Sequence, residues 1–217
     1  MKRIIALSLV FVMLFAFTAC KEKDEYDTSY PSRTAAFYGN MNPESFYFAM
    51  RFTNNGATYD FAQATNGKTV TTLEDHSDNS YDKYHIYDGS CVHKLDLSAK
   101  KYDTLVGPKG QEFIFGGYTS EMFNSPSSAG VGEFEGQEYY CESFVTAGSG
   151  RNNYYYDGYD LKVIEIIENG KTVMVMRIKE FSNTIPDDVY LSIPSGFKAG
   201  QLEYEAPDVS FDDSWIP

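Results

Sequence analysis

A hairpin between residues 161 and 181 constrains this chain's fold more than any other feature. Two runs rich in β-branched and apolar residues flank Asn169 and Gly170. This dipeptide favours a two-residue type I′ turn, because both central residues of that turn need positive φ. Side chains alternate between the two faces of a strand. One face of the hairpin is therefore expected to carry Leu161, Val163, Met174, Met176 and Ile178.

The other face of the same hairpin is apolar as well. A two-residue turn places Ile166 opposite Val173, and Ile164 and Val175 share their face. An antiparallel sheet with one solvated face alternates cleanly between apolar and polar residues. Both faces of this hairpin therefore need cover, either from other parts of the protein or from an apolar ligand.

The composition is that of a globular β-protein. The chain has 217 residues with 42% hydrophobic side chains, 18 Tyr and 16 Phe. This length suits one domain, and aromatic side chains fit the pleated surface of a sheet. The formal net charge of −13 argues against binding nucleic acid, whose phosphates are held by basic patches.

Short alternating segments joined by tight turns predict an antiparallel meander of about ten strands. The first strand begins near Ser45 and places Phe48, Met50 and Phe52 on one face. An excursion at 107–130 interrupts the meander, and so long an insertion is expected to plug or cross the sheet. A sheet of this size must curl, split or close.

The first residues read as a targeting segment. Lys2 and Arg3 precede an apolar run over 4–18, which is shorter than the roughly 20 residues that a membrane-spanning helix needs. Cys20 follows directly after this run and Ala19, and it resembles the site of lipid attachment in bacterial lipoproteins. An ordinary secretory signal that happens to contain a cysteine is the alternative.

These features divide the chain into four parts. Residues 1–19 are expected to be a lipoprotein signal peptide and 20–33 a lipidated tether, followed by the β-domain at 34–206 and an acidic tail at 207–217. Two acyl chains on one residue give stable anchoring. The expected location is therefore the cell membrane, with the domain on its extracytoplasmic face.

Two cysteines remain if Cys20 carries lipid. Outside the cytoplasm, Cys91 and Cys141 could form a disulfide. They could equally be unpaired thiols on separate strands, because a bridge needs Cα atoms within about 7 Å of each other.

No motif in the chain points to catalysis, a metal or a cofactor. The nucleophile elbow Gly-x-Ser-x-Gly and the phosphate-binding P-loop are both absent. Cys91 and His93 share a strand face, and His85 joins them only if the turn between the two strands has three residues. Zinc takes four ligands, or three and a water, and nothing else nearby offers a thiolate or an imidazole, so ordinary strand histidines are the favoured interpretation. We therefore expect a protein that is not an enzyme.

Neighbouring predicted strands carry a cluster of tyrosines, whose rings could stack on sugars if they were exposed. The alternative is an aromatic-rich sheet in which the rings are simply packed. The cluster comprises Tyr139, Tyr140, Tyr154, Tyr155, Tyr156 and Tyr159.

The overall pattern resembles a known family. The lipoprotein signal, the strand meander, the run 138–142 (Glu-Tyr-Tyr-Cys-Glu), the Asn-Gly hairpin and the run 193–197 (Ile-Pro-Ser-Gly-Phe) resemble lipidated Gram-positive proteins that share the fold of the outer-membrane lipoprotein carrier. The resemblance covers roughly residues 45–198. It implies a strongly curved antiparallel sheet, an incomplete and half-open β-barrel, with a short helical or loop plug on its concave side.

Relatives of this kind shelter acyl chains or other apolar molecules. The resemblance and the apolar faces together predict a carrier of an apolar or lipid ligand. A surface module that recognises glycan or protein through the tyrosine-rich strands is the alternative. The residues expected to line the ligand site are Phe48, Met50, Phe52, Leu161, Val163, Met174, Met176 and Ile178.

Overall fold

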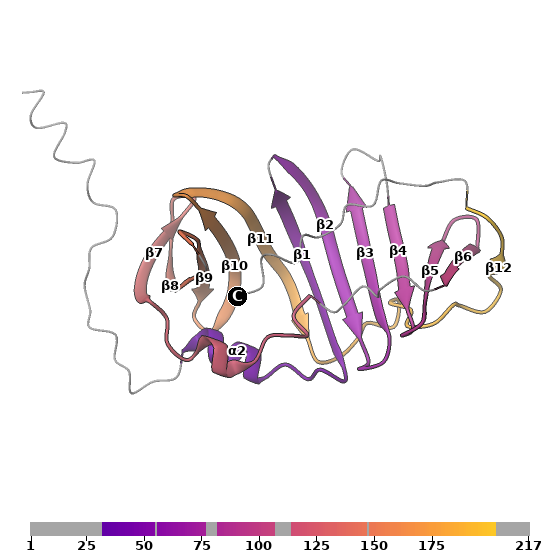
Figure 1. Ribbon diagram of the computed structural model, residues 1–217, viewed down its shortest axis with the longest axis horizontal. Helices are drawn as coiled ribbons and strands as arrows, with labels where there is room; N and C mark the ends of the chain where they lie inside the picture. Colours follow the sequence, from indigo (N-terminus) through magenta and orange to yellow (C-terminus); the bar gives the residue numbers. More distant parts are fainter. Residues whose placement is uncertain (1–31, 55, 77–81, 107–113, 147, 203–217) are drawn as a thin grey trace, which may run out of the picture.

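The computed structural model describes residues 32–202, apart from 55, 77–81, 107–113 and 147, and these residues form one sheet with one short α-helix (Figure 1). Helix α2 spans Arg33–Gly39, and a 3-10 turn, η1, spans Ser120–Phe123. The strands are β1 (Phe46–Asn54), β2 (Ala57–Thr65), β3 (Val70–His76), β4 (Asp82–Tyr87), β5 (Cys91–Asp96), β6 (Lys101–Val106), β7 (Ser128–Phe134), β8 (Gln137–Val145), β9 (Arg151–Asp157), β10 (Asp160–Glu168), β11 (Lys171–Ser182) and β12 (Lys198–Ala199).

The strands form a twelve-stranded sheet in the order β12-β6-β5-β4-β3-β2-β1-β11-β10-β9-β8-β7. Every neighbouring pair is antiparallel except β12 and β6. Two meanders, β1–β6 and β7–β11, meet where β1 pairs with β11. The end strands β7 and β12 do not pair with each other, so the sheet is not closed. The prediction of a mainly antiparallel, open β-fold is confirmed, with twelve strands rather than about ten.

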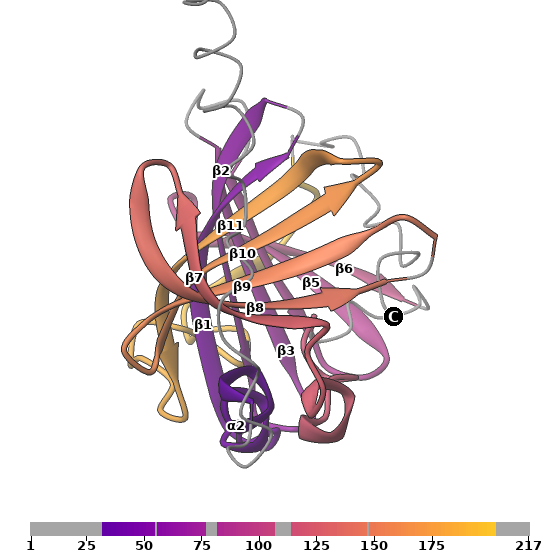
Figure 2. The ribbon, with the colours of Figure 1, turned by 90° about the vertical axis from the view of Figure 1, so that its left-hand side faces the viewer.

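The sheet is strongly twisted, as expected for a wide sheet of right-handed strands. In Figure 2, strands β8–β11 cross the direction of β1–β3 steeply. Helix α2 lies at one end of the β8–β11 region in both views. The two meanders therefore form differently oriented walls, and the chain between 114 and 127 passes beside α2 before β7 begins.

The hairpin β10–β11 has the predicted turn but not the predicted register. Asn169 and Gly170 have φ angles of 50° and 73°, as a type I′ turn requires. Ile166 pairs with Met174, because Val173 is the extra residue of a β-bulge. A bulge adds one residue to one strand and so exchanges the faces of the side chains beyond it. The prediction that Ile166 lies opposite Val173 is wrong.

The bulge redistributes the apolar residues of the hairpin. Ile164 now pairs with Met176, and both belong to the main core. A second register shift, between Leu161 and Val163, places Leu161 on the same face as Ile164 and Met176. Val163 instead pairs with Arg177 and points the other way. We call the face that carries Ile164 and Met176 the inner face, and its opposite the outer face.

Segments of the protein itself cover the inner face. Tyr38 of α2 stacks on Phe123 of η1 with ring centroids 4.4 Å apart. Phe48 of β1 packs edge-on against Phe115, with centroids 4.8 Å apart. The expected plug within 107–130 is thus present in its described part, while 107–113 lie outside the described residues. The buried cluster comprises Ala35, Tyr38, Phe46, Phe48, Met50, Phe52, Phe61, Phe115, Phe123, Phe144, Tyr154, Tyr156, Leu161, Ile164, Met174 and Met176.

Candidate functional site

The side chains expected to line an apolar ligand are part of this packed core. Phe48, Met50 and Phe52 have 0% exposure and belong to the core cluster, where Phe48 and Phe52 pack against other aromatic rings of the protein. Val163 faces away from the others. These residues therefore pack against parts of their own chain, and their role in lining a ligand stays a prediction. The set that packs in or against the core comprises Phe48, Met50, Phe52, Leu161, Met174, Met176 and Ile178.

A hollow lies on the outer face of the sheet instead. A groove of about 890 Å³ crosses β1–β5 there. Along its floor, Ala49 pairs with Ala62, Ala62 with Leu73, and Leu73 with Tyr84. Leu95 continues the same lining on β5. The two paired alanines, Ala49 and Ala62, have the shortest side chains of this row.

Strand alternation explains how the same strands can serve both the groove and the core. Ala49 lies between Phe48 and Met50, and Ala62 follows Phe61. Successive side chains of a strand point to opposite faces. The same two strands therefore present large apolar residues to the inner face and alanines to the outer face.

Charged residues form one rim of the groove. Asp60 accepts two hydrogen bonds from Arg51, with Nε–Oδ1 2.7 Å and Nη2–Oδ2 3.0 Å apart. Lys179 of β11 forms an ion pair with the same carboxylate. The hydrogen bond from Arg51, followed by the one from Lys179, lowers the pKa of Asp60 to about 2. Asp60, Lys179 and the exposed Asp75 give the groove a polar side next to its apolar floor.

Residues 190–202, which we call the C-terminal strap, border the groove elsewhere. The Tyr190 N–H donates to the Tyr84 hydroxyl oxygen at 2.6 Å, and burial raises the pKa of Tyr84 to about 12. Phe197 packs against the small cluster that contains Tyr84 and Leu95. Gln201 and Leu202 then line the groove directly. The strap was not foreseen, because its contacts with β3 and β4 join residues more than 100 positions apart.

The tyrosine-rich strands do not present an aromatic platform at their central residues. Tyr154 and Tyr156 are 2% and 1% exposed, and the Tyr156 hydroxyl donates to Thr34 Oγ1 of α2 at 2.8 Å. Tyr155 faces the outer side but is also buried. Tyr159, in the β9–β10 turn, is 85% exposed. Sugar stacking on Tyr154 and Tyr156 is therefore contradicted by their burial.

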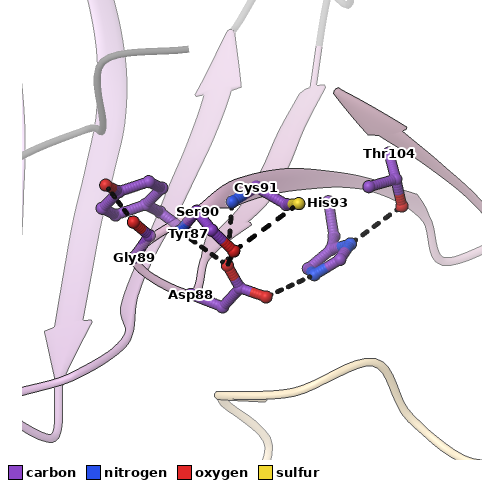
Figure 3. A network of polar contacts seen from close by, with 7 residues as sticks. All are labelled: Tyr87, Asp88, Gly89, Ser90, Cys91, His93 and Thr104. Atoms are coloured by element: carbon purple, nitrogen blue, oxygen red, sulfur yellow. Dashed lines mark hydrogen bonds and ion pairs between the residues drawn. The ribbon is translucent and has the colours of Figure 1, made fainter. Parts of the chain in front are cut away.

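A polar cluster surrounds Cys91 at the β4–β5 turn (Figure 3). The Asp88 carboxylate accepts from the backbone N–H of Ser90 and of Cys91, and these bonds hold its pKa well below the usual range. His93 Nε2 lies 3.2 Å from Asp88 Oδ2, and its Nδ1 lies 2.9 Å from Thr104 Oγ1. Both ring nitrogens are thus engaged, and neither is left to activate the Cys91 thiol. The cluster fits a role in fixing the turn.

His85 is separated from this cluster, because it pairs with Lys94 on the inner face whereas His93 pairs with Ile86 on the outer face. Within the described part of the chain, no three His, Cys, Asp or Glu residues are grouped to hold a metal ion.

The cysteines do not form a disulfide, which is the second alternative. Cys91 and Cys141 both keep their thiols. They lie on β5 and β8, and seven strands stand between these two in the sheet order. A disulfide between them is therefore corrected to two separate, half-buried thiols.

Sequence reasoning missed the carboxylate that holds α2 in place. Glu142 of β8 is fully buried and accepts from Ser32 Oγ at 2.6 Å, from Arg33 N at 2.8 Å and from Thr34 N at 2.9 Å. The first N–H groups of a helix lack intrahelical partners, so this carboxylate caps the helix from a distant strand. The Arg33 guanidinium lies 3.7 Å above the Tyr140 ring.

A second buried carboxylate organises the outer face of β9–β11. Glu165 accepts from the hydroxyls of Tyr155 at 2.7 Å and Thr172 at 2.6 Å, and from Asn153 Nδ2 at 3.0 Å. Burial, and then the hydrogen bond to Glu165, raise the pKa of Tyr155 far above its ordinary value. This network gives the outer face of the hairpin a polar lining, so an apolar ligand is not needed to cover it.

The signal peptide 1–19, Cys20 and the tail 207–217 lie outside the described residues. Among the described residues, no helix has the length and hydropathy needed to cross a bilayer.

Comparisons with known proteins find similarity only among solved structures. No family model and no curated protein matches the chain. An uncharacterized conserved protein from Thermus thermophilus aligns with a TM-score of 0.43 and 5% identity, over 77% of this chain and 97% of that one. MucB aligns with a TM-score of 0.41 and 10% identity, over 72% of this chain and 58% of its own. MucB in the Pseudomonas aeruginosa MucA/MucB complex aligns with a TM-score of 0.40 and 12% identity, over 81% of this chain and 65% of its own. This chain thus spans less than two thirds of the MucB chains, and it resembles all three structures only distantly in fold.

Proposed function

We propose that this protein is a non-enzymatic lipoprotein, anchored to the membrane through Cys20, that binds or carries an apolar ligand such as a lipid or acyl chain. The ligand site of the proposal is the outer-face groove. The observation that carries it is the apolar floor formed by Ala49, Ala62, Leu73 and Leu95. The groove's volume of about 890 Å³ falls within the range of roughly 300–1,000 Å³ that small-molecule sites usually have.

The arrangement of the groove suits a ligand with one polar end. Apolar surface gains roughly 25 cal/mol for each Å² removed from water, and the floor offers such surface across several strands. Lys179 and Asp60 at the rim would meet the polar end of the ligand, and the Lys179 ammonium would suit an acyl carboxylate or phosphate. The lipid on Cys20 would keep this groove close to the bilayer from which such ligands come.

Lipid extraction of the purified protein followed by mass spectrometry tests the proposal. We expect a stoichiometric apolar compound from the wild type. The variant Ala49→Phe places a ring on the floor of the groove, so we expect it to lose the compound. Val145→Phe is the matched control, because Val145 is exposed on β8 at the other end of the sheet, and this variant should retain the compound.

Two results would overturn the proposal. One is the recovery of no apolar compound from the wild type, even after incubation with a phospholipid extract. The other is equal recovery from Ala49→Phe and from Val145→Phe. Circular dichroism of each variant confirms that the sheet is intact, so that loss of the ligand is not confused with loss of the fold.

A further inference from the structure

We propose that residues 203–217, the acidic segment at the end of the chain, fold back into the outer-face groove and occupy it when no ligand is bound. The binding surface is the floor around Ala62 and Leu73. The part of this inference that concerns competition with a ligand rests on the proposed function. The intramolecular contact itself does not.

The chain leaves the described residues at the groove itself. β12 pairs Lys198 with Lys101 and Ala199 with Tyr102, and the Gly200 N–H donates to the Tyr102 carbonyl at 3.0 Å. These bonds fix the strap on β6. The next residues, 201 and 202, already line the groove. The last fifteen residues of the chain therefore start from its wall.

The remaining chain is long enough to cross the whole groove. Fifteen extended residues span at most about 50 Å, at roughly 3.3–3.6 Å each. The groove crosses β1–β5, and neighbouring strands lie about 4.8 Å apart, which makes roughly 20 Å from the first strand to the fifth. The segment can therefore reach the alanine floor with chain to spare.

The composition of the segment matches both parts of the surface. Its acidic residues come just after the place where the chain leaves β12, and three exposed lysines lie there: Lys100, Lys101 and Lys198. Its apolar residues suit the floor beyond, where Leu97 is still 47% exposed. The acids are Glu203, Glu205, Asp208, Asp212 and Asp213, without any Lys or Arg, and the large apolar residues are Tyr204, Val209, Phe211, Trp215 and Ile216.

Trp215 makes the inference directly measurable, because it is the single tryptophan of the chain. In the purified protein without ligand, we expect a blue-shifted emission and shielding from acrylamide. Ala62→Glu places a charge on the floor and should move both values to those of free tryptophan. Val131→Glu, at an exposed position of β7, is the matched control and should leave both unchanged. Phe211→Ser tests the same contact from the segment's side and should also release Trp215.

A titration with cis-parinaric acid, a fluorescent fatty acid, separates this inference from the proposed function. If the probe displaces residues 203–217 from the groove, Trp215 should become accessible to acrylamide as the probe binds. A probe that binds while Trp215 is exposed from the start overturns the inference and leaves the proposed function standing. A shielded Trp215 that Ala62→Glu releases supports the intramolecular contact, even if the probe does not bind. If Trp215 is shielded from acrylamide and neither Ala62→Glu nor Phe211→Ser changes this shielding, the inference is overturned.

Discussion

At the scale of single residues, His85 shows how the fold changes the chemistry of a side chain. Its imidazole is buried on the inner face of β4. Burial, followed by the nearby charges of Lys83 and Lys94, lowers the pKa of His85 from 6.5 to about 3. Lys83 is itself paired with Glu74 at 2.9 Å, which balances its charge. The imidazole is therefore neutral in the folded protein at any ordinary pH.

This shift predicts a loss of stability in mild acid. Below its ordinary pKa of about 6.5, His85 takes up a proton in the unfolded chain but not in the fold. Its contribution to stability is thus complete above pH 6.5 and is lost as the pH falls towards 3, at up to about 1.4 kcal/mol per pH unit. Urea unfolding between about pH 4 and 6.5 measures this slope, and His85→Gln should reduce it. Equal slopes for the wild type and His85→Gln would contradict the assignment.

The Asp60 carboxylate affects stability over a lower pH range than His85 does. Asp60 has a pKa of about 2 in the fold, against an ordinary value of about 3.9. Its stabilising contribution is therefore present above its ordinary pKa and is lost as the pH falls from about 4 towards 2. The decrease in the free energy of unfolding between about pH 6.5 and 4 therefore reports on His85 rather than on the Asp60 ion pairs.

At the scale of elements, the alternation of apolar and polar residues predicted where the strands lie but not the register in which they pair. The turn at Asn169-Gly170 follows from the positive φ that those residues tolerate. The bulge at Val173 does not, because no local preference separates a bulged hairpin from a regular one here. Residues 190–193 form no strand, since the strap bonds to β3 and β4 side chains and not to a neighbouring strand.

Helix α2 depends on the sheet in the same way. Seven residues are too few for a stable isolated helix. Glu142 holds two backbone N–H groups and one hydroxyl at the helix start. The helix in turn covers the inner face, so a single carboxylate couples β8 to the closure of the core.

Removal of this carboxylate should destabilise the whole domain. Glu142→Ala leaves buried N–H groups unpaired, and hydrogen bonds to a charged group contribute about 1.5–3 kcal/mol each. We expect the free energy of unfolding to fall by roughly 2–4 kcal/mol on that basis, measured from the urea midpoint. Glu138→Ala removes an exposed carboxylate of the same strand and should change little. Similar midpoints for the two variants would show that Glu142 is not the cap that holds α2.

At the scale of the whole molecule, one open sheet separates two surfaces of different character. The inner face is filled by aromatic rings from α2, η1 and the segment before it. The outer face keeps a groove over β1–β5 and a polar network over β9–β11. The proposed ligand site and the proposed anchor lie at different parts of the chain, and the predicted tether at 20–33 would connect them.

The anchor is a prediction that cell fractionation can check. Two acyl chains hold a protein stably on a bilayer, so the wild type should sediment with membranes and carry an increased N-terminal mass. Cys20→Ala removes the attachment point and should leave the protein with its leader uncleaved or in the soluble fraction, without the added mass. Cys91→Ala, on β5, is the control and should behave like the wild type. Lipid mass that persists in Cys20→Ala would disprove the assignment.

Local structure could be inferred from the order of residues alone. Alternating residues and Gly-containing turns predicted most strands of an antiparallel meander, since these depend on neighbours in the chain, whereas the unclosed sheet was implied only by the family resemblance. Which face of the sheet is filled became clear only from the folded molecule. The alanines at 49 and 62 meet through strand pairing, and Glu142 reaches α2 across more than 100 residues. The groove and the cap both depend on contacts between distant residues, which no local pattern encodes.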